Sequence, residues 1–222
     1  MHDTRHSAAP STSSPAIAGR WPLAGIAFAG MFIGGLILST VLGTRTFPSP
    51  YEPAEAITQY FTDNVSAVLG LGLLHTISAL PLLIFTATLA DSVRDGLPRA
   101  LSQHAGLIAA VFLLISGMCS VALVSDGVTG DALRALHMLT FLSGGSVHVF
   151  YLGILVGAGT IALIGSVPRA IAVLGGISAV LSLASIVSLV VPGAAFLLPL
   201  GRFTGLAWII ATAIWLVRRR PA

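Results

Sequence analysis

The sequence predicts an all-α polytopic membrane protein, built as a bundle of six transmembrane helices, and three observations indicate it. Apolar stretches of about 20 residues recur along the chain, and each can cover the roughly 30 Å hydrocarbon core at ~1.5 Å per residue. Only 9% of the 222 residues are charged, the mean hydropathy is +0.96, and a soluble domain has about 25% charged residues. Arginines also gather in alternate loops, as they do around membrane spans.

The elements follow from the positions of these stretches. Residues 1–19 are rich in Ser, Thr, Pro and Ala, so we expect a disordered cytoplasmic tail. The six-span domain then occupies residues 20–222, with Pro22 well placed to open its first helix. The spans are predicted at residues 22–43, 67–90, 105–124, 139–165, 170–191 and 196–217.

Two segments between the spans have apolar residues at helical spacing. Residues 53–64 and 131–138 therefore predict short amphipathic helices, which we expect to lie on the outer surface ahead of the second and fourth spans.

The arginines orient the spans. All eleven basic residues are Arg, as is typical of a GC-rich bacterial genome. With the N-terminus in the cytoplasm, eight of them lie inside and only Arg45, Arg134 and Arg202 lie at or near the outer face. We therefore expect a multi-pass protein of the bacterial inner membrane with both termini cytoplasmic.

The chain also shows a weak internal repeat. When His75 is laid on His148, each histidine follows a Gly-rich segment and precedes a hydrophobic stretch that ends in Pro-Arg-Ala. Two such units in the same orientation would form a tandem repeat of helix hairpins. A Leu-, Gly- and Ala-rich composition can also produce this match by itself.

Three polar residues within the spans are the candidate site. His75, His148 and Arg202 each lie roughly 24–27 Å from the inner boundary of their span, at ~1.5 Å per residue. One interpretation is structural, with the imidazoles hydrogen-bonded across helices and Arg202 reaching the outer headgroups. A second is a bis-histidine metal or haem b site at His75 and His148. A third is an anionic headgroup or small anion bound by Arg202 and the two histidines.

The sequence limits which groups can compensate the charge of Arg202. An Arg on a membrane helix costs about 2.5–3.5 kcal/mol at mid-bilayer, so compensation is needed. The rest of its span is apolar until Arg218, which places the partner elsewhere. We expect an outer carboxylate that clamps an outer helix over the bundle, or else a lipid phosphate. The carboxylate candidates are Asp126, Asp131, Glu52 and Glu55.

Composition and motifs exclude other classes. The basic residues flank spans and form no nucleic-acid patch, and the single Cys119 permits neither a disulfide nor a thiolate metal site within one chain. No catalytic residue or resident cofactor is predicted. We expect a non-enzymatic accessory protein, or one that interacts with lipid or a small solute. A small transporter or channel subunit is an alternative.

Small residues indicate how the helices approach one another. Gly30 with Gly34, and Gly153 with Gly157, form Gly-x-x-x-Gly spacings. Such pairs support close packing within the bundle, and they could also form a homo-oligomer interface.

The final span also carries a resemblance. Its segment Leu-Pro-Leu-Gly-Arg-Phe-Thr-Gly-Leu-Ala-Trp at 198–208 resembles a pattern of small six-helix bacterial membrane proteins, frequent in actinobacteria, that share a domain of unknown function. Val167-Pro168-Arg169 and the outer segment 55–61 with Asn64 are similar to theirs. The resemblance implies an all-helical inner-membrane protein and carries no reaction, substrate or site.

Overall fold

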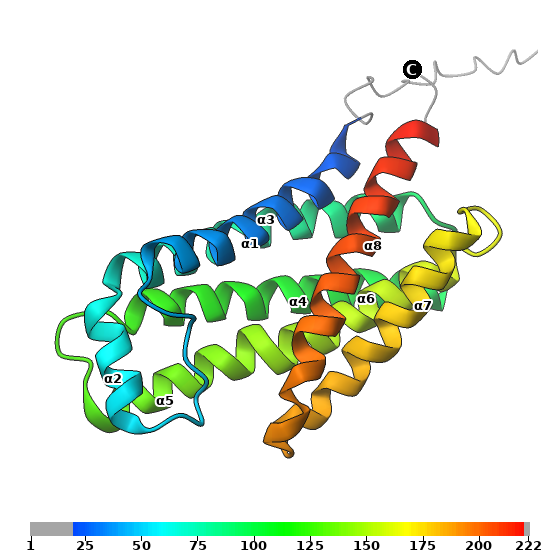
Figure 1. The fold of residues 1–222 in the computed structure, drawn as a ribbon. Coiled ribbons are helices and arrows are strands. Elements are labelled where there is room, and N and C mark those ends of the chain that lie inside the picture. The colour runs from blue at the N-terminus through cyan, green and yellow to red at the C-terminus, as the bar shows by residue number, and fades with distance from the viewer. Residues whose placement is uncertain (1–19, 220–222) are drawn as a thin grey trace, which may run out of the picture.

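The computed structural model describes residues 20–219, and the regular elements in that range are all helices (Figure 1). Within it, six helical stretches are long and apolar enough to cross a membrane, which confirms the predicted all-α polytopic bundle. The tail expected at 1–19 lies outside the described residues. The six stretches are Trp21–Leu42, Val65–Asp91, Leu97–Ala122, Gly130–Leu163, Arg169–Leu189 and Pro192–Arg219.

Eight α-helices and four shorter helical segments form this part of the chain. The α-helices are α1 (Ala24–Leu42), α2 (Ala54–Asp63), α3 (Val65–Asp91), α4 (Leu97–Ala122), α5 (Gly130–Phe141), α6 (His148–Leu163), α7 (Arg169–Ala184) and α8 (Leu197–Arg219). A π-helix (Leu142–Val147) joins α5 to α6, and 3-10 helices cover Trp21–Leu23, Ser185–Leu189 and Pro192–Phe196.

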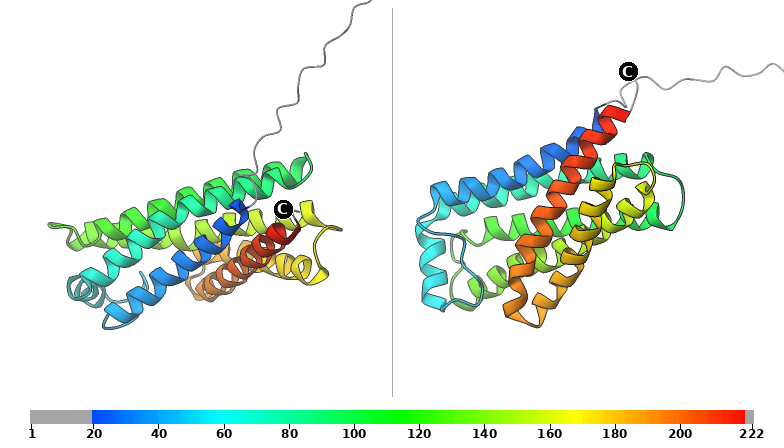
Figure 2. Two further views of the ribbon diagram at one scale, coloured as in Figure 1. Left: turned by 90° about the horizontal axis from the view of Figure 1, so that it is seen from above. Right: turned by 45° about the vertical axis from the view of Figure 1, so that its right-hand side comes forward.

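The long helices pack in the order α1, α3, α4, α6, α7 and α8, and α8 returns to contact α1. Helices α1 and α8 lie close together near the described termini and diverge towards the opposite end (Figure 1; Figure 2, right). Between the long helices, large side chains such as Phe28, Phe85 and Trp208 are fully buried.

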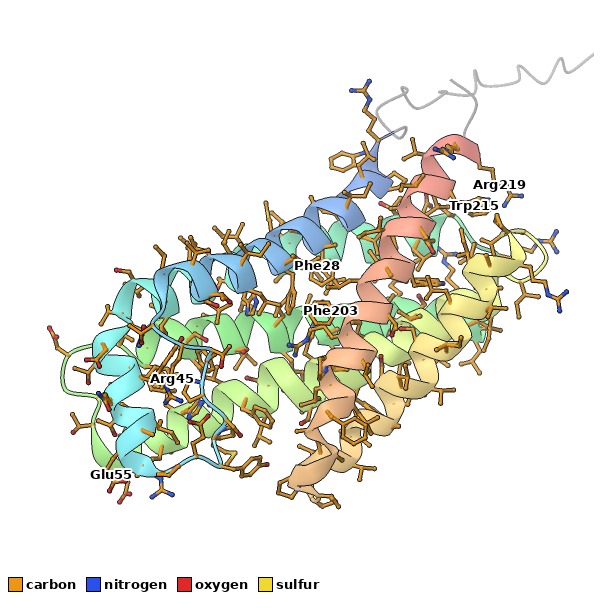
Figure 3. The ribbon with its side chains drawn as sticks, in the orientation of Figure 1. Phe28, Arg45, Glu55, Phe203, Trp215 and Arg219 are labelled. Atoms are coloured by element: carbon orange, nitrogen blue, oxygen red, sulfur yellow. The ribbon has the colours of Figure 1, made fainter. Side chains whose placement is uncertain are left out.

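The two ends of the bundle differ in character. We call the end near the described termini the Arg-rich end, because Arg20, Arg94, Arg169 and Arg219 lie there at loops or helix ends. The opposite end, covered by α2, α5 and the segment 43–53, is called the cap end. Figure 3 shows Arg219 beside Trp215 at one end of the molecule and Arg45 with Glu55 at the other.

The second outer helix differs from the prediction. Helix α2 is a separate helix with Ile57, Tyr60 and Phe61 buried. The other expected surface helix, 131–138, is instead the outward continuation of a span, since α5 runs through the π-helix into α6 as one 34-residue stretch. The reason is local: Gly144 and Gly145 loosen the helix into a π-helix but no proline interrupts it. The third span also begins early, at Leu97.

The segment 43–53, here called the strap, is fixed across the cap end. Phe47 makes edge-on contacts with Tyr60, Phe61 and His137, with ring centroids 5.5–5.7 Å apart. The next residue, Pro48, accepts a hydrogen bond of 3.2 Å from His137 Nε2 through its carbonyl. The strap is thus packed against both α2 and α5.

An ion pair closes the strap on itself. Arg45 Nη1 donates to Glu52 Oε2 at 2.8 Å, and its other terminal nitrogen donates to the Ala56 carbonyl at 2.9 Å. The Arg45 hydrogen bond holds the pKa of Glu52 below its ordinary value of 4.5.

This pair predicts a small dependence of cap stability on pH. A lowered folded-state pKa means that the contribution of Glu52 is present above about pH 4.5 and is lost as the pH falls through the folded-state value. The thermal midpoint of wild type should therefore drop slightly more on acidification than that of Glu52→Gln. The control is Glu55→Gln, which replaces an exposed carboxylate at the same end. Its thermal midpoint should fall on acidification by as much as that of wild type. Parallel curves for wild type and Glu52→Gln would contradict the prediction.

The two glycine motifs have different surroundings. A Cβ on Gly153 would lie 2.6 Å from Ser182 Cβ, and one on Gly157 would lie 3.1 Å from Ala179 Cβ, so both glycines serve the α6–α7 contact. Within the described residues, nothing lies within 4 Å of a Cβ placed on Gly30 or Gly34. Only the α1 pair is thus open to a neighbouring molecule.

Candidate functional site

Phe32 on α1 brings the three predicted site residues together. Its ring, 1% exposed, stacks on the His75 imidazole with centroids 4.4 Å apart and planes 10° apart. The His148 ring is also nearly parallel to it, at 6.3 Å and 8°. On α8, the Arg202 guanidinium carbon lies 5.1 Å from the Phe32 centroid. The common depth predicted for the three residues thus corresponds to one cluster.

A cavity of about 290 Å³ lies beside this cluster, towards the cap end. His75 and Arg202 line it, whereas His148 is fully buried behind it and is not part of the lining. The strap contributes Phe47 to the cavity. The remaining lining residues come from α1, α3, α4, α5, the π-helix, the 3-10 helix Pro192–Phe196 and the start of α8. They are Leu36, Leu71, Ser116, Ser120, Thr140, Phe141, Gly144, Gly145, Ala195, Leu198 and Pro199.

Arg202 is held by backbone and aromatic contacts. Its Nη2 donates to the carbonyl oxygen of Gly144, and its guanidinium lies over Phe32. Its Nε is buried and has no hydrogen-bond partner in the described part of the chain. Among residues 20–219 the only ion pairs are Arg45–Glu52 and Arg99–Asp95, so no protein carboxylate neutralises Arg202 there.

The expected carboxylate clamp on Arg202 is therefore wrong. Glu52 is taken by Arg45 in the strap, and Glu55, Asp126 and Asp131 are exposed at the cap end. Arg202 lies beyond the first turn of α8, which begins at Leu197, and its side chain is turned inwards to the π-helix. The positions along the chain could not show this direction.

The π-helix supplies the acceptor for Arg202. A π-helix replaces the regular i→i−4 hydrogen bonds with wider ones, and such segments occur frequently at functional sites. Gly144 also permits close approach to α4, because a Cβ there would lie 2.7 Å from Ser116 Cβ. The run Ser143-Gly144-Gly145-Ser146 is the sequence signal for this segment; it supported the internal repeat above, but it was not interpreted as a π-helix.

The two histidines have different hydrogen-bonding states. His148 Nδ1 lies 2.8 Å from the Ala109 carbonyl oxygen, and because a carbonyl only accepts, the proton must be on Nδ1. In the neutral ring, His148 Nε2 then has a lone pair and cannot donate. His75 is 8% exposed, and its Nε2 has no hydrogen-bond partner among residues 20–219. His75 is therefore free to place a proton on Nε2 and donate it to a ligand.

The described residues supply some, but not all, of the features that a metal centre needs. His148 has the tautomer that a metal ligand needs, with its other nitrogen donating to a backbone carbonyl. Within the described residues, no group of three His, Cys, Asp or Glu side chains could hold a metal ion. Only His75 of the pair reaches the cavity, so the two imidazoles do not face one common space.

The arrangement suits binding better than catalysis. Arg202 supplies a cation and His75 a potential donor at the wall of an apolar cavity. The hydroxyls of Ser116, Ser120 and Thr140 donate to backbone carbonyls at 2.9–3.0 Å. Comparisons of the chain with protein-family models, with curated proteins and with solved structures give no match.

Proposed function

We propose that the protein is a non-enzymatic membrane protein that binds a negatively charged group in the cavity beside Arg202. The observation that carries this proposal is a guanidinium within a span that has no carboxylate partner among residues 20–219 and lines an apolar cavity. An Arg costs about 2.5–3.5 kcal/mol at mid-bilayer and less near an interface, and a desolvated cation–π contact returns about 2 kcal/mol without neutralising the charge. A bound anion would supply the missing charge compensation.

Removing the charge tests this proposal. We expect anionic ligands to raise the thermal midpoint of the wild-type protein in detergent, and Arg202→Gln to abolish that rise. Arg134→Gln removes the same charge from an exposed position on α5 and should respond like wild type. A panel of short carboxylates, phosphate, sulfate and amphiphilic anions covers the class. Equal responses of wild type and Arg202→Gln to every anion would refute the proposal.

A haem or metal site at His75 and His148 is the second candidate. The observation that favours it is the Nδ1–H of His148, which leaves Nε2 as a potential iron ligand. A visible spectrum of the purified protein distinguishes the two. A Soret band that is lost in His148→Ala would establish the redox function instead.

A small transporter is the third candidate, and buried hydroxyls favour it. From Arg202 towards the Arg-rich end, Ser182, Ser178, Thr160 and Thr212 have buried side-chain oxygens without hydrogen-bond partners among the described residues. They follow the α6–α7–α8 interface and continue the polar cluster inwards. Anion flux into proteoliposomes, abolished in Arg202→Gln, would favour transport over binding alone.

We also propose that both termini lie in the cytoplasm of a bacterial cell. The support is the concentration of arginines at the Arg-rich end, where positive charge favours the inner side. Alkaline phosphatase fused after Ala222 should be inactive, and a fluorescent protein fused there should fold. An active phosphatase would refute this orientation.

The remaining predictions on partners are a lipid environment, a homo-oligomer and membership of the six-helix family described above. The apolar helices support contact with the bilayer. For a homo-oligomer, the open face of Gly30 and Gly34 on α1 is the supporting feature.

A further inference from the structure

We propose that the ligand is a single-chain amphiphile with a carboxylate head, such as a fatty acid, whose head binds Arg202 and His75 while its tail fills the apolar cavity. This inference rests on the proposed function and specifies the chemical class of its ligand. It depends on where the cavity has open polar atoms, on its size and on its charge.

The residues that line the cavity include two buried polar atoms without a hydrogen-bond partner in the described structure. Ser116 Oγ donates to the Thr140 carbonyl at 3.0 Å, and Ser120 Oγ and Thr140 Oγ1 donate to carbonyls of their own helices at 2.9 Å. Among the described lining residues, only Arg202 Nε and His75 Nε2 are buried side-chain nitrogens or oxygens that lack a partner. A ligand therefore needs one small polar group and is otherwise in contact with apolar walls.

The apolar walls favour a hydrocarbon tail. Leu36, Leu71 and Leu198 contribute aliphatic surface from three different helices, and Phe47 and Phe141 contribute aromatic rings. A volume of about 290 Å³ is at the lower end of the ~300–1000 Å³ typical of ligand pockets. One short hydrocarbon chain fits a space of this size.

The charge of the site favours a carboxylate head. A carboxylate has one negative charge and two oxygens, which match one guanidinium and one imidazole donor. A phosphate dianion would bring a second charge that no cation in the described lining balances, and an uncompensated charge away from water is costly. His148 does not contribute, since its Nε2 has no proton to donate.

Binding of radiolabelled dodecanoate to the protein in phosphatidylcholine nanodiscs tests the inference, with empty nanodiscs subtracted. We expect saturable binding that unlabelled dodecanoate displaces and that dodecanol and acetate do not displace. Dodecyl phosphate should compete at least about tenfold more weakly. Arg202→Gln should weaken binding at least about tenfold, and Arg134→Gln should leave it unchanged.

A variant of His75 tests the imidazole. His75→Phe retains a ring to stack on Phe32 but removes Nε2, so the affinity for dodecanoate should fall. Should Arg202→Gln not fold, Arg202→Lys keeps the charge without the planar fork and should bind more weakly than wild type.

The possible failures are distinguishable. Acetate that binds as tightly as dodecanoate, with both dependent on Arg202, would overturn the amphiphile and leave the proposed anion site standing. Tighter binding of dodecyl phosphate would overturn the carboxylate head. Dodecanol that competes as well as dodecanoate, together with unchanged binding in Arg202→Gln, would overturn both proposals.

Discussion

Deletion of Gly145 is expected to abolish the anion site beside Arg202. The π-helix is a wide turn that takes up one residue more than an α-helical turn needs, so the deletion should restore a regular α-helix through this segment. Helices α5 and α6 should keep their relative phase, because the wide turn already takes up the extra residue. The Gly144 carbonyl, which accepts from Arg202, should instead accept a regular hydrogen bond within the helix.

The expected loss is about 1.5–3 kcal/mol of unfolding free energy, the contribution of a hydrogen bond to a charged group. Thermal unfolding in detergent measures it, and anion binding should be lost together with the Gly144 carbonyl contact to Arg202. Gly145→Ala is the matched control. A Cβ at that position lies 3.6 Å from Leu198 Cδ1, an ordinary contact, so this variant should unfold like wild type. A deletion variant as stable as wild type would show that the π-helix is dispensable.

Gly201→Ala should be one of the most destabilising glycine-to-alanine substitutions in the bundle. A Cβ at Gly201 would lie 2.7 Å from Ser182 Cα and 2.9 Å from its backbone nitrogen. The obstacle is backbone, which cannot move aside as a flexible side chain can, so α7 and α8 must separate. Overpacking of this kind costs about 1–3 kcal/mol. Since Arg202 is the next residue, anion binding should weaken as well.

Gly176→Ala is the control for this substitution. Gly176 also lies in a membrane helix, and nothing in the described structure lies within 4 Å of a Cβ placed there. Alanine is favoured over glycine in helices by about 1 kcal/mol, so Gly176→Ala should raise the thermal midpoint slightly. Opposite signs for the two substitutions are the expected result. Stabilisation by both would mean that α7 and α8 pack less closely than described.

The helices and their depth could be predicted from the sequence because lipid imposes strict rules. A span needs about 20 apolar residues, and each residue adds ~1.5 Å, so length alone gives the spans. The same arithmetic placed His75, His148 and Arg202 at one level, and the structure brings them together around Phe32. The depth of a residue in the membrane depends only on its position along its helix, and this position can be counted in the sequence.

Directions around a helix axis could not be predicted in the same way. Phe32 is one of many apolar residues in its span, and its contact with the two histidine rings depends on how α1 is rotated. The inward turn of Arg202 depends on the π-helix, whose Gly144 carbonyl accepts its hydrogen bond. The helix at 131–138 was misplaced for a related reason. The sequence shows the helical spacing of its apolar residues, but it does not show that this helix continues into α6.

The position of Phe47 has a consequence for the thermodynamics of binding. This residue packs on Tyr60, Phe61 and His137 in the cap and also lines the cavity. Ligand binding in the cavity and ordering of the strap are therefore coupled through Phe47. The coupling free energy is reciprocal, so each process favours the other by the same factor. Occupancy of the cavity should slow hydrogen exchange in the strap. In the other direction, protonation of Glu52, or any change that breaks the Arg45–Glu52 ion pair, should weaken ligand affinity by the same factor. A low pH at the cap end would then act as a negative effector of a site within the membrane.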